Sequence, residues 1–354
     1  MRGAKYIASP SDGQDILRIL ESSAAQGGFE LIYTRRDDAY ASYEKEPGEA
    51  KIFISKDGDR VVGTCAELIR EVYIGGERRR AAYVCGLKKD AEYDGLVGFG
   101  PGFIKALQQD DVDYYYCSVV ADNADAQKMF AKGGRALTIE PVAKYKTYIL
   151  SPRVRVKAPR HSYLFRQACP EDLPGLLAFL NQEGSKKDLF PVMDSLAPYP
   201  NLEIHNFYLL LDGKQIIACG ALWNQVDYKQ YIVKKYNGII KLARLANPLL
   251  SALGYIRLPR ENAPLDFATL SFFLSKDDNE TLYRIFLREI RKEIAEKHEM
   301  FVLGLAEDHV ATPILAKLPN ISFETMLYAI TFPWSNQSYT PADPHRMHPE
   351  CGLL

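Results

Sequence analysis

Residues 85–102 of the chain read CGLKKDAEYDGLVGFGPG. An apolar, strand-like run ends at Lys89, a glycine-rich turn follows, and a helical pattern begins near Gly98. Such a turn leaves free backbone N–H groups at a helix N-terminus, which suits a pyrophosphate, and glycine lets the phosphate approach the backbone closely. Because short glycine motifs also arise by chance, a plain strand-to-helix loop is the alternative.

Residues 119–134, VVADNADAQKMFAKGG, form a second strand-to-helix junction. A strand ends near Val120, Asn123 has the side chain of a helix N-cap, and Gly133 and Gly134 can end the helix. Taken alone, this stretch predicts a capped amphipathic helix and no particular chemistry.

Together, and at this spacing, the two stretches resemble the GNAT superfamily of acyl-CoA N-acyltransferases. The family pattern is a strand that ends near a Pro-x-x-Arg-Gly-x-Gly loop, then a helix, a strand and Asn-x-x-Ala-x-x-x-Tyr-x-x-x-Gly. The positions that fit are Gly95, Asn123, Ala126 and Gly134, with Phe130 at the Tyr position. The positions that depart are Ala91 for Pro, Asp94 for Arg and Val97 for Gly. The resemblance covers about residues 5–150 and extends more faintly across 160–333.

The resemblance implies an α/β fold whose open, mixed sheet is split between the strands at residues 80–89 and 113–120. Pantetheine would lie in that split, and an acyl thioester, most simply acetyl-CoA, would meet an amine directly. The cofactor-binding residues implied are Leu87, Lys88 and Lys89 on the strand, Gly95, Leu96, Val97, Gly98, Phe99 and Gly100 in the loop, and Asn123, Ala126 and Phe130 on the later helix. No metal is expected.

Direct transfer requires a proton to leave the amine and a proton to reach the thiolate. Phe130 cannot donate a proton, so another group or water must do so. By family topology the candidate catalytic residues are Glu67, as a base, and Ser118, which could order a water. The alternation of Cys65, Glu67 and Ile69 places Glu67 among apolar residues on one strand face, which favours a buried carboxylate with a perturbed pKa. An exposed strand residue is the alternative.

The second half of the chain repeats the first in order. Residues 8–12 match 168–172, the hairpin at 56–62 matches 211–217, and the junction at 121–132 matches 306–317. We therefore predict a tandem duplication: a CoA-binding domain at 1–150, a linker at 151–160, a degenerate GNAT-like domain at 161–334 and a tail at 335–354. The larger offset of the last match predicts a helical insertion at about 228–255.

The second half lacks the cofactor-binding pattern. Its matching strand-to-helix junction, residues 273–280, has no glycine and places Asp277, Asp278 and Glu280 where phosphates would lie. We expect this half to bind no CoA and to complete a substrate cleft. Gln225 and Lys229, at a strand end near Trp223, could bind substrate or simply pack.

Composition restricts the class of protein. The net charge of the 354 residues is -1, which does not favour a nucleic-acid partner. The six cysteines form no C-x-x-C pair, which indicates reduced thiols and a cytoplasmic protein, and no membrane partner is expected. Prolines around His345 and His348 argue against a metal site in the tail.

Three functions stay open at this point. The first is an acyl-CoA-dependent N-acyltransferase acting on a small-molecule or peptide amine. The second is transfer of an amino acid from aminoacyl-tRNA, which the near-neutral charge disfavours. The third is a catalytically inactive GNAT-like binding or regulatory module, which Asp94 and Phe130 would suit.

Overall fold

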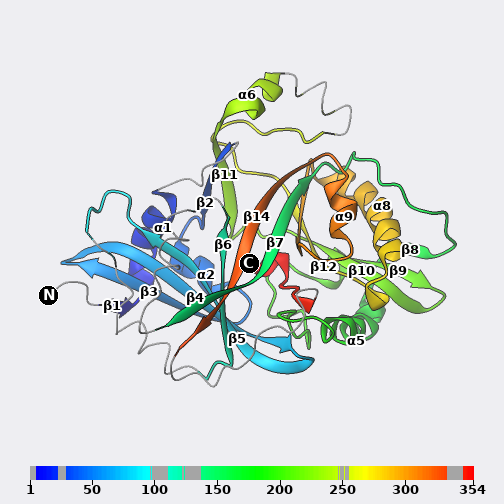
Figure 1. The fold of residues 1–354 in the computed structure, drawn as a ribbon, viewed down its shortest axis with the longest axis horizontal. Coiled ribbons are helices and arrows are strands. Elements are labelled where there is room, and N and C mark those ends of the chain that lie inside the picture. The colour runs from blue at the N-terminus through cyan, green and yellow to red at the C-terminus, as the bar shows by residue number, and fades with distance from the viewer. Residues whose placement is uncertain are drawn as a thin grey trace.

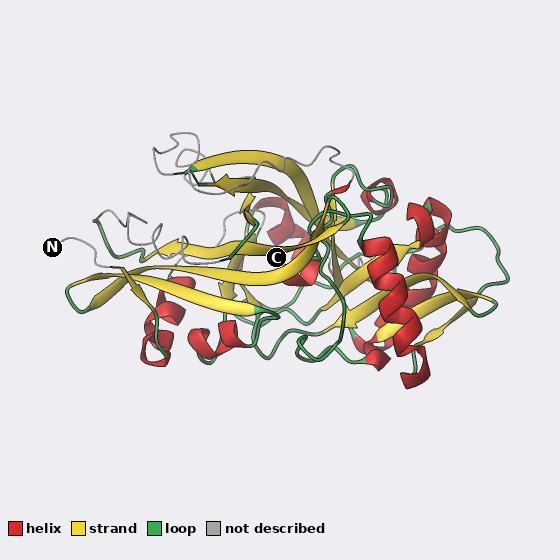
Figure 2. Ribbon diagram, turned by 90° about the horizontal axis from the view of Figure 1, so that it is seen from below, coloured by secondary structure: helices red, strands yellow, loops and turns green. Residues whose placement is uncertain are grey.

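The computed structural model describes residues 5–22, 29–95, 111–121, 137–245, 255–332 and 346–354, together with residues 97, 123, 247 and 251. The described strands form one mixed sheet of twelve strands and a separate ribbon of two. The sheet extends along the length of the molecule (Figure 2), and helices flank both of its halves (Figure 1). The α/β mixed-sheet class predicted from the sequence is confirmed.

The first half begins with a short strand, a capped turn and an amphipathic helix. Ile16, Ile19 and Leu20 of that helix are fully buried against the strands that follow, because they recur at helical spacing on one face. The elements of this half are β1 (Lys5–Ile7), α1 (Gly13–Glu21), β2 (Phe29–Thr34), α2 (Ala39–Glu44), β3 (Glu49–Asp57), β4 (Arg60–Ile74), β5 (Glu77–Lys89), β6 (Tyr114–Val120) and β7 (Thr138–Leu150).

The second half has the same succession of elements. They are β8 (Leu164–Gln167), α5 (Leu173–Gly184), β9 (Phe207–Asp212), β10 (Gln215–Trp223), β11 (Gln230–Tyr236), α6 (Gly238–Leu245), β12 (Ala268–Ser275), α8 (Glu280–Lys297), β13 (Phe301–Ala306), α9 (Thr312–Ala316) and β14 (Asn320–Thr331). Short 3₁₀ turns lie at Pro10–Asp12, Pro170–Asp172, Ile204–Asn206, Lys276–Asp278 and Cys351–Leu353.

The two halves correspond in detail. The strand order β1-β3-β4-β5-β6 of the first half matches the order β8-β9-β10-β12-β13 of the second. Even the turn before the first helix is repeated: the Asp12 carboxylate accepts the N–H of Ser9 at 2.9 Å, and the Asp172 carboxylate accepts the N–H of Cys169 at 2.8 Å. The repeat predicted from the sequence is therefore a repeat of one fold.

The last strands of the two halves are exchanged. β14, the end of the second half, pairs antiparallel with β6 of the first half, and β7, the end of the first half, pairs antiparallel with β13 of the second. β7 and β14 also pair with each other along their whole lengths and cross the centre of the molecule (Figure 1). β7 is one continuous strand, and both of its partners come from the other half.

The segment predicted as a helical insertion begins as a strand. β11 pairs antiparallel with β2 of the first half, from Gln230 opposite Thr34 to Tyr236 opposite Phe29, and only then does the chain turn into α6. The insertion therefore forms a second bridge between the halves. Among the described helices, none combines the length and the apolar character needed to cross a membrane.

Candidate functional site

The sheet of the first half opens between β5 and β6. The two strands run parallel and pair from Ala81 opposite Tyr114 to Val84 opposite Cys117. Beyond that point β6 continues beside β14, whereas β5 continues to Lys89 beside β4. The split predicted from the sequence lies at this place.

A β-bulge marks the start of the split on β5. Cys85 pairs with Ala66 and Lys88 pairs with Thr64, so that two residues of β5, Gly86 and Leu87, lie opposite one residue of β4. Gly86 has φ +61°, a conformation that glycine adopts without strain. A Cβ at this position would also collide with the hydroxyl oxygen of Tyr43. Both the backbone and the neighbouring side chain therefore require glycine here.

The second half contains the same bulge. Ser271 pairs with Ala221 and Leu274 pairs with Cys219, so Phe272 takes the place of Gly86 and has φ +53°. Parallel pairing of β12 with β13 ends at Thr269 opposite Val302, and the strands then separate. Here the bulge N–H is engaged, because the N–H of Phe272 donates to Oε2 of Glu350 at 2.7 Å.

The C-terminal residues 346–354, called the tail below, occupy the split of the second half. The Glu350 carboxylate also accepts the N–H of Gly352 at 3.2 Å, and a Cβ at Gly304 of β13 would lie only 2.8 Å from Sγ of Cys351. Burial raises the pKa of Glu350 to about 6, against the hydrogen bonds that it accepts from Phe272 and Gly352. Figure 1 places the end of the tail at the centre of the molecule, between the two halves.

The tail then reaches a buried cluster of charges that belongs to both halves. Lys229 donates to the carbonyl oxygens of Gly352 at 3.2 Å and Leu354 at 3.1 Å, and Arg70 of β4 donates to that of Leu353 at 3.1 Å. Gln225 also donates to the Gly352 carbonyl, at 2.8 Å. The linker between β10 and β11 is thereby joined to β4 through the tail.

One carboxylate holds this cluster together. Oε1 of Glu46 accepts from Nη2 of Arg35 at 2.6 Å and lies 3.6 Å from Nζ of Lys229. Burial by itself would raise the pKa of Glu46, but Lys229 and Arg35 lower it to about 2. The Arg35 guanidinium lies 3.9 Å from the ring centroid of Tyr43, so the cluster extends to the hydroxyl that faces Gly86.

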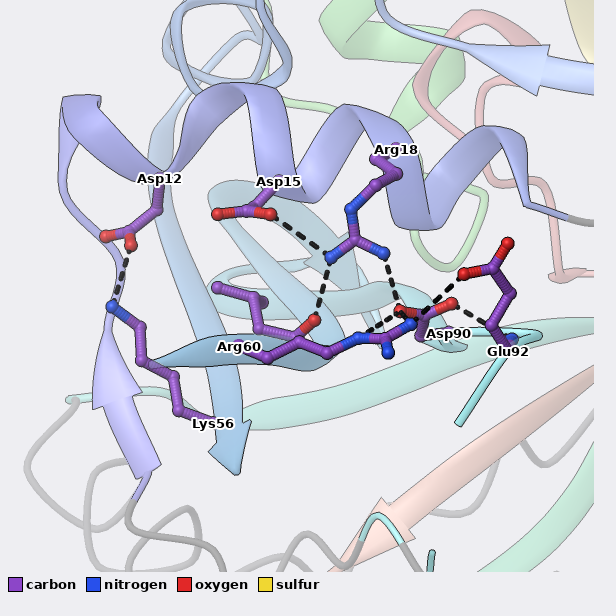
Figure 3. Close-up of polar contacts among 8 residues, drawn as sticks. Asp12, Asp15, Arg18, Lys56, Arg60, Asp90 and Glu92 are labelled. Carbon is purple, nitrogen blue, oxygen red and sulfur yellow. Dashed lines mark hydrogen bonds and ion pairs between the residues drawn. The ribbon is translucent and has the colours of Figure 1, made fainter. Parts of the chain in front are cut away.

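A second charged group fixes the turn that follows β5. Arg18 of α1 and Arg60 of β4 converge on the buried Asp90 carboxylate, at 2.5 and 2.9 Å (Figure 3). Burial would raise the pKa of Asp90, yet the hydrogen bond from Arg18 and those from Glu92 and Arg60 lower it to about 2. The start of the predicted phosphate loop is therefore anchored to the first helix.

The predicted pantetheine-binding residues lie on β5 beyond the bulge. Leu87 is exposed, and Lys89 is exposed with its Nζ 3.4 Å from the carbonyl oxygen of Gly95. Lys88 is half-buried and its ammonium donates to the Leu20 carbonyl, so its side chain turns toward α1. Burial lowers the pKa of Lys88 to about 8. The predicted contact with pantetheine is one that the backbone of these residues would make, and it does not depend on their side chains.

The predicted loop is described only in part. A Cβ at Gly95 would collide with the ring of Tyr93, whereas Val97 packs so closely on Gly63 of β4 that a Cβ there would collide with it. Asn123 is exposed, and its N–H donates to the Val120 carbonyl at 3.0 Å. The other predicted positions, Leu96, Gly98, Phe99, Gly100, Ala126 and Phe130, lie outside the described residues.

Glu67 is buried, as the strand alternation predicted. It is 0% exposed, and neither carboxylate oxygen accepts a hydrogen bond from the described residues. Burial raises its pKa to about 7, although Lys51 on the neighbouring strand opposes the shift. Glu67 lies directly opposite Val84, the last residue of β5 that pairs with β6.

Ser118 lies just past the apex of the split, where its hydroxyl is 2.5 Å from that of Tyr83. Tyr83 packs in the cluster that includes α1 and α2, whereas Cys65, on the same strand face as Glu67, packs with Tyr115 on the other side of the sheet. The two predicted catalytic residues therefore point to opposite faces.

Three buried ionic residues of the site, Arg35, Glu46 and Arg70, were not predicted from the sequence. Arg35 and Glu46 lie in a polar stretch, and Arg70 lies at the end of a strand pattern, so no local signal separates them from surface charges. Lys229 was noted near a strand end, but its partners are more than 120 positions away in the chain.

Lysine side chains pair with two of the acidic residues at the second-half junction. Lys186 lies 2.8 Å from the Asp277 carboxylate, and Lys187 lies 2.6 Å from that of Asp278. These ion pairs offset part of the negative charge that would oppose an anionic ligand. The tail, which lies in the split of this half, adds a steric reason against CoA binding there.

The histidine of the tail is part of a packed core. The ring centroids of His348 and His309 lie 5.0 Å apart, and both residues are buried. Burial lowers the pKa of His309 to about 3 and holds the pKa of His348 well below its ordinary value. Across the described ranges, no group of three or more His, Cys, Asp or Glu side chains is placed to hold a metal ion.

No protein-family model and no curated protein sequence matches the chain. Solved structures do. N-myristoyltransferase of Saccharomyces cerevisiae with bound myristoyl-CoA is 10% identical, with a TM-score of 0.59 over 98% of this chain and 86% of that one. A GCN5-related N-acetyltransferase from Anabaena variabilis is 12% identical, with a TM-score of 0.52 over 92% and 72%. A probable N-acyltransferase from Enterococcus faecalis is 9% identical, with a TM-score of 0.51 over 93% and 72%. The chain therefore has the fold of the GNAT-type N-acyltransferases, built from two GNAT-like halves.

Proposed function

We propose that the protein is an acyl-CoA-dependent N-acyltransferase, most simply an acetyltransferase, with one catalytic site in the split between β5 and β6. The observation that carries the proposal is the bulge at Gly86, together with its filled counterpart in the second half. There, the equivalent N–H of Phe272 donates to a carboxylate oxygen of Glu350 at 2.7 Å. The N–H of Gly86 would offer the same donor to the carbonyl oxygen of a thioester.

This placement matches the needs of acyl transfer. When an amine attacks the thioester carbon, negative charge develops on the carbonyl oxygen, and a fixed backbone donor stabilises it without reorganisation. The pantetheine arm would run along the backbone of Leu87, Lys88 and Lys89. The phosphates would meet the loop that Asp90 anchors through Arg18 and Arg60.

The solved structures with this fold support a CoA thioester as the acyl donor, since one of them has myristoyl-CoA bound. The acceptor that we propose is a small-molecule or peptide amine, and we propose no nucleic-acid partner. The six cysteines are all free, which supports our proposal of a reducing, cytoplasmic environment.

We expect one CoA to bind per chain, because the tail already fills the split of the second half. Isothermal titration of the full chain with CoA, followed by transfer assays from acetyl-CoA to a panel of amines, measures both the stoichiometry and the activity. A stoichiometry of two would contradict the assignment of the tail. Absence of CoA binding would overturn the proposed function and favour a GNAT-like module without a thioester ligand.

Glu67→Gln is expected to lower turnover by roughly 10²-fold, with little change in CoA affinity, if Glu67 accepts the amine proton.

The Glu67→Gln variant should also be more stable than wild type at high pH. The carboxyl has a pKa of about 7 in the folded chain against 4.5 ordinarily, so its contribution to stability is lost as the pH rises through this window. At roughly 1.4 kcal/mol per unit, the gain of Glu67→Gln is about 3 kcal/mol at pH 8 and near zero at pH 4.

Urea unfolding at the two pH values and steady-state kinetics with acetyl-CoA test the two parts of this prediction separately. Full activity in Glu67→Gln would remove the residue from the mechanism. Equal stability of the two proteins at pH 8 would show that the carboxyl titrates normally. Glu71, an exposed residue farther along β4, supplies the control Glu71→Gln, which should change neither quantity.

A further inference from the structure

We propose that Tyr43 of α2 is the proton donor to the leaving thiolate, an inference that rests on the proposed function and adds a catalytic residue to it. The position that commonly carries a donor in proteins with this pattern holds Phe130 here, so the reaction lacks an assigned acid. Ser118 is already paired with Tyr83 at 2.5 Å, beside the apex of the split. Tyr43 supplies a hydroxyl at the bulge itself.

The contact between Tyr43 and Gly86 fixes the place of that hydroxyl. A Cβ on residue 86 would meet the Tyr43 hydroxyl oxygen first and Cζ of the same ring next, at 3.4 Å, whereas the nearest atom of another residue, the backbone nitrogen of Ala66, is 3.9 Å away. The hydroxyl therefore lies over the bulge residue, whose N–H we assign to the thioester carbonyl. The sulfur of a thioester is bonded to the same carbon as that carbonyl oxygen, so it comes within reach of the same hydroxyl.

The surroundings of Tyr43 hold it in one orientation. The residue is 1% exposed and packs among the side chains of the first-half core. The guanidinium of Arg35 lies 3.9 Å from its ring centroid, and Arg35 is itself held by Ser42 at 3.1 Å and Glu46 at 2.6 Å. A ring fixed in this way needs no rearrangement at the moment of reaction.

The same surroundings suit a group that gives up a proton and recovers it. Burial raises the pKa of Tyr43, so the hydroxyl is protonated at neutral pH, while the positive charge of Arg35 opposes that rise. A phenolate that forms transiently would therefore face a fixed cation. Arg35 acts here as a positioning and electrostatic residue, since it lies against the ring and not against the reacting atoms.

Acyl transfer forms one C–N bond and breaks one C–S bond. The amine nitrogen bonds to the acyl carbon, and the carbonyl oxygen takes up the electron pair under the Gly86 N–H. The C–S bond then breaks, its electron pair passes to sulfur, and sulfur takes the proton of Tyr43. Glu67, the base proposed above, takes the proton that the former amine nitrogen releases and passes it to solvent, and the phenolate recovers a proton from solvent. The products are one amide and one free thiol, and the enzyme is unchanged.

The test compares two leaving groups in Tyr43→Phe, with hydroxylamine as the probe nucleophile and thiol release as the readout. The CoA thiolate needs a proton as it leaves. The second donor is S-(4-nitrophenyl) thioacetate, whose leaving group, 4-nitrothiophenolate, is stable without a proton. We expect Tyr43→Phe to slow release from acetyl-CoA by roughly 10²-fold, and release from the nitrophenyl thioester by less than about threefold. CoA affinity, measured by calorimetry, should be unchanged.

The outcomes separate the possibilities. An equal loss with both donors would assign Tyr43 a structural role and overturn the proposal, as would no loss with acetyl-CoA. CoA binding without thiol release by the wild-type chain would overturn the proposed function as well. Tyr148→Phe is the matched control, because Tyr148 is a fully buried tyrosine in the second-half core, and it should react like wild type with both donors.

Discussion

Glu46→Ala is expected to lower the free energy of unfolding by about 3–5 kcal/mol, the usual effect of removing one partner from a buried ionic group. The carboxylate is 3% exposed and is the group that faces both Arg35, at 2.6 Å, and Lys229, at 3.6 Å. Without it, two buried cations repel each other across the junction of α2 with the β10–β11 linker. Chemical unfolding at neutral pH measures the loss.

The pH dependence of this effect has a defined sign. The pKa of Glu46 is about 2 in the folded chain against 4.5 ordinarily, so the carboxylate stabilises the fold above pH 4.5 and this contribution is lost as the pH falls toward 2. The difference between wild type and Glu46→Ala should therefore shrink in acid. Glu44→Ala, at the exposed last residue of α2 and two positions before Glu46, is the control and should stay within about 0.5 kcal/mol of wild type. A loss of that small size in Glu46→Ala would contradict the assignment of a buried ionic cluster.

Gly86→Ala should slow acyl transfer by roughly 10²- to 10³-fold, the factor in rate that one oxyanion donor supplies. The added methyl group would force a residue with φ +61° out of its conformation and would collide with the Tyr43 hydroxyl. Either adjustment moves the N–H that we assign to the thioester. Turnover with acetyl-CoA and the thermal midpoint of unfolding are the two measurements.

Gly58→Ala separates strain from function. Gly58, at the tip of the β3–β4 hairpin, has φ +59°, nearly that of Gly86, but a Cβ there would meet no atom within 4 Å. We expect Gly58→Ala to cost some stability through backbone strain and to keep its activity. The double variant Gly86→Ala with Tyr43→Phe should recover stability relative to Gly86→Ala without recovering transfer. Normal turnover in Gly86→Ala would exclude the bulge from the site.

Much of the architecture follows from local patterns that the sequence displays. The hairpin signal at Asp57-Gly58 predicts that β3 and β4 are antiparallel neighbours, since a tight turn brings the two flanking strands side by side. The ordered repeat predicted two halves of one fold, and the split between β5 and β6 was expected where the structure has it. The burial of Glu67 was visible in the alternation of its strand.

The exchange of β7 and β14 could not be derived in this way. Both strands are long and amphipathic, and such a pattern is satisfied equally by a partner in the same half or in the other. The same is true of β11, whose partner β2 lies about 200 positions earlier in the chain. Which edge a strand joins depends on the packing of the complete molecule, and no local periodicity records it.

Local patterns in the sequence predicted the ordered repeat of the two halves and the β3–β4 hairpin, because these depend on neighbours within one hairpin or one helix turn. Tertiary structure alone decided what surrounds the bulge. Glu350 reaches Phe272 from 78 positions away, and Lys229 reaches the tail across 125. Charged residues such as Arg35 and Glu46 resemble surface residues until distant segments bury them together. Their burial is favourable only because each then meets an opposite charge, and that pairing exists only in the folded chain.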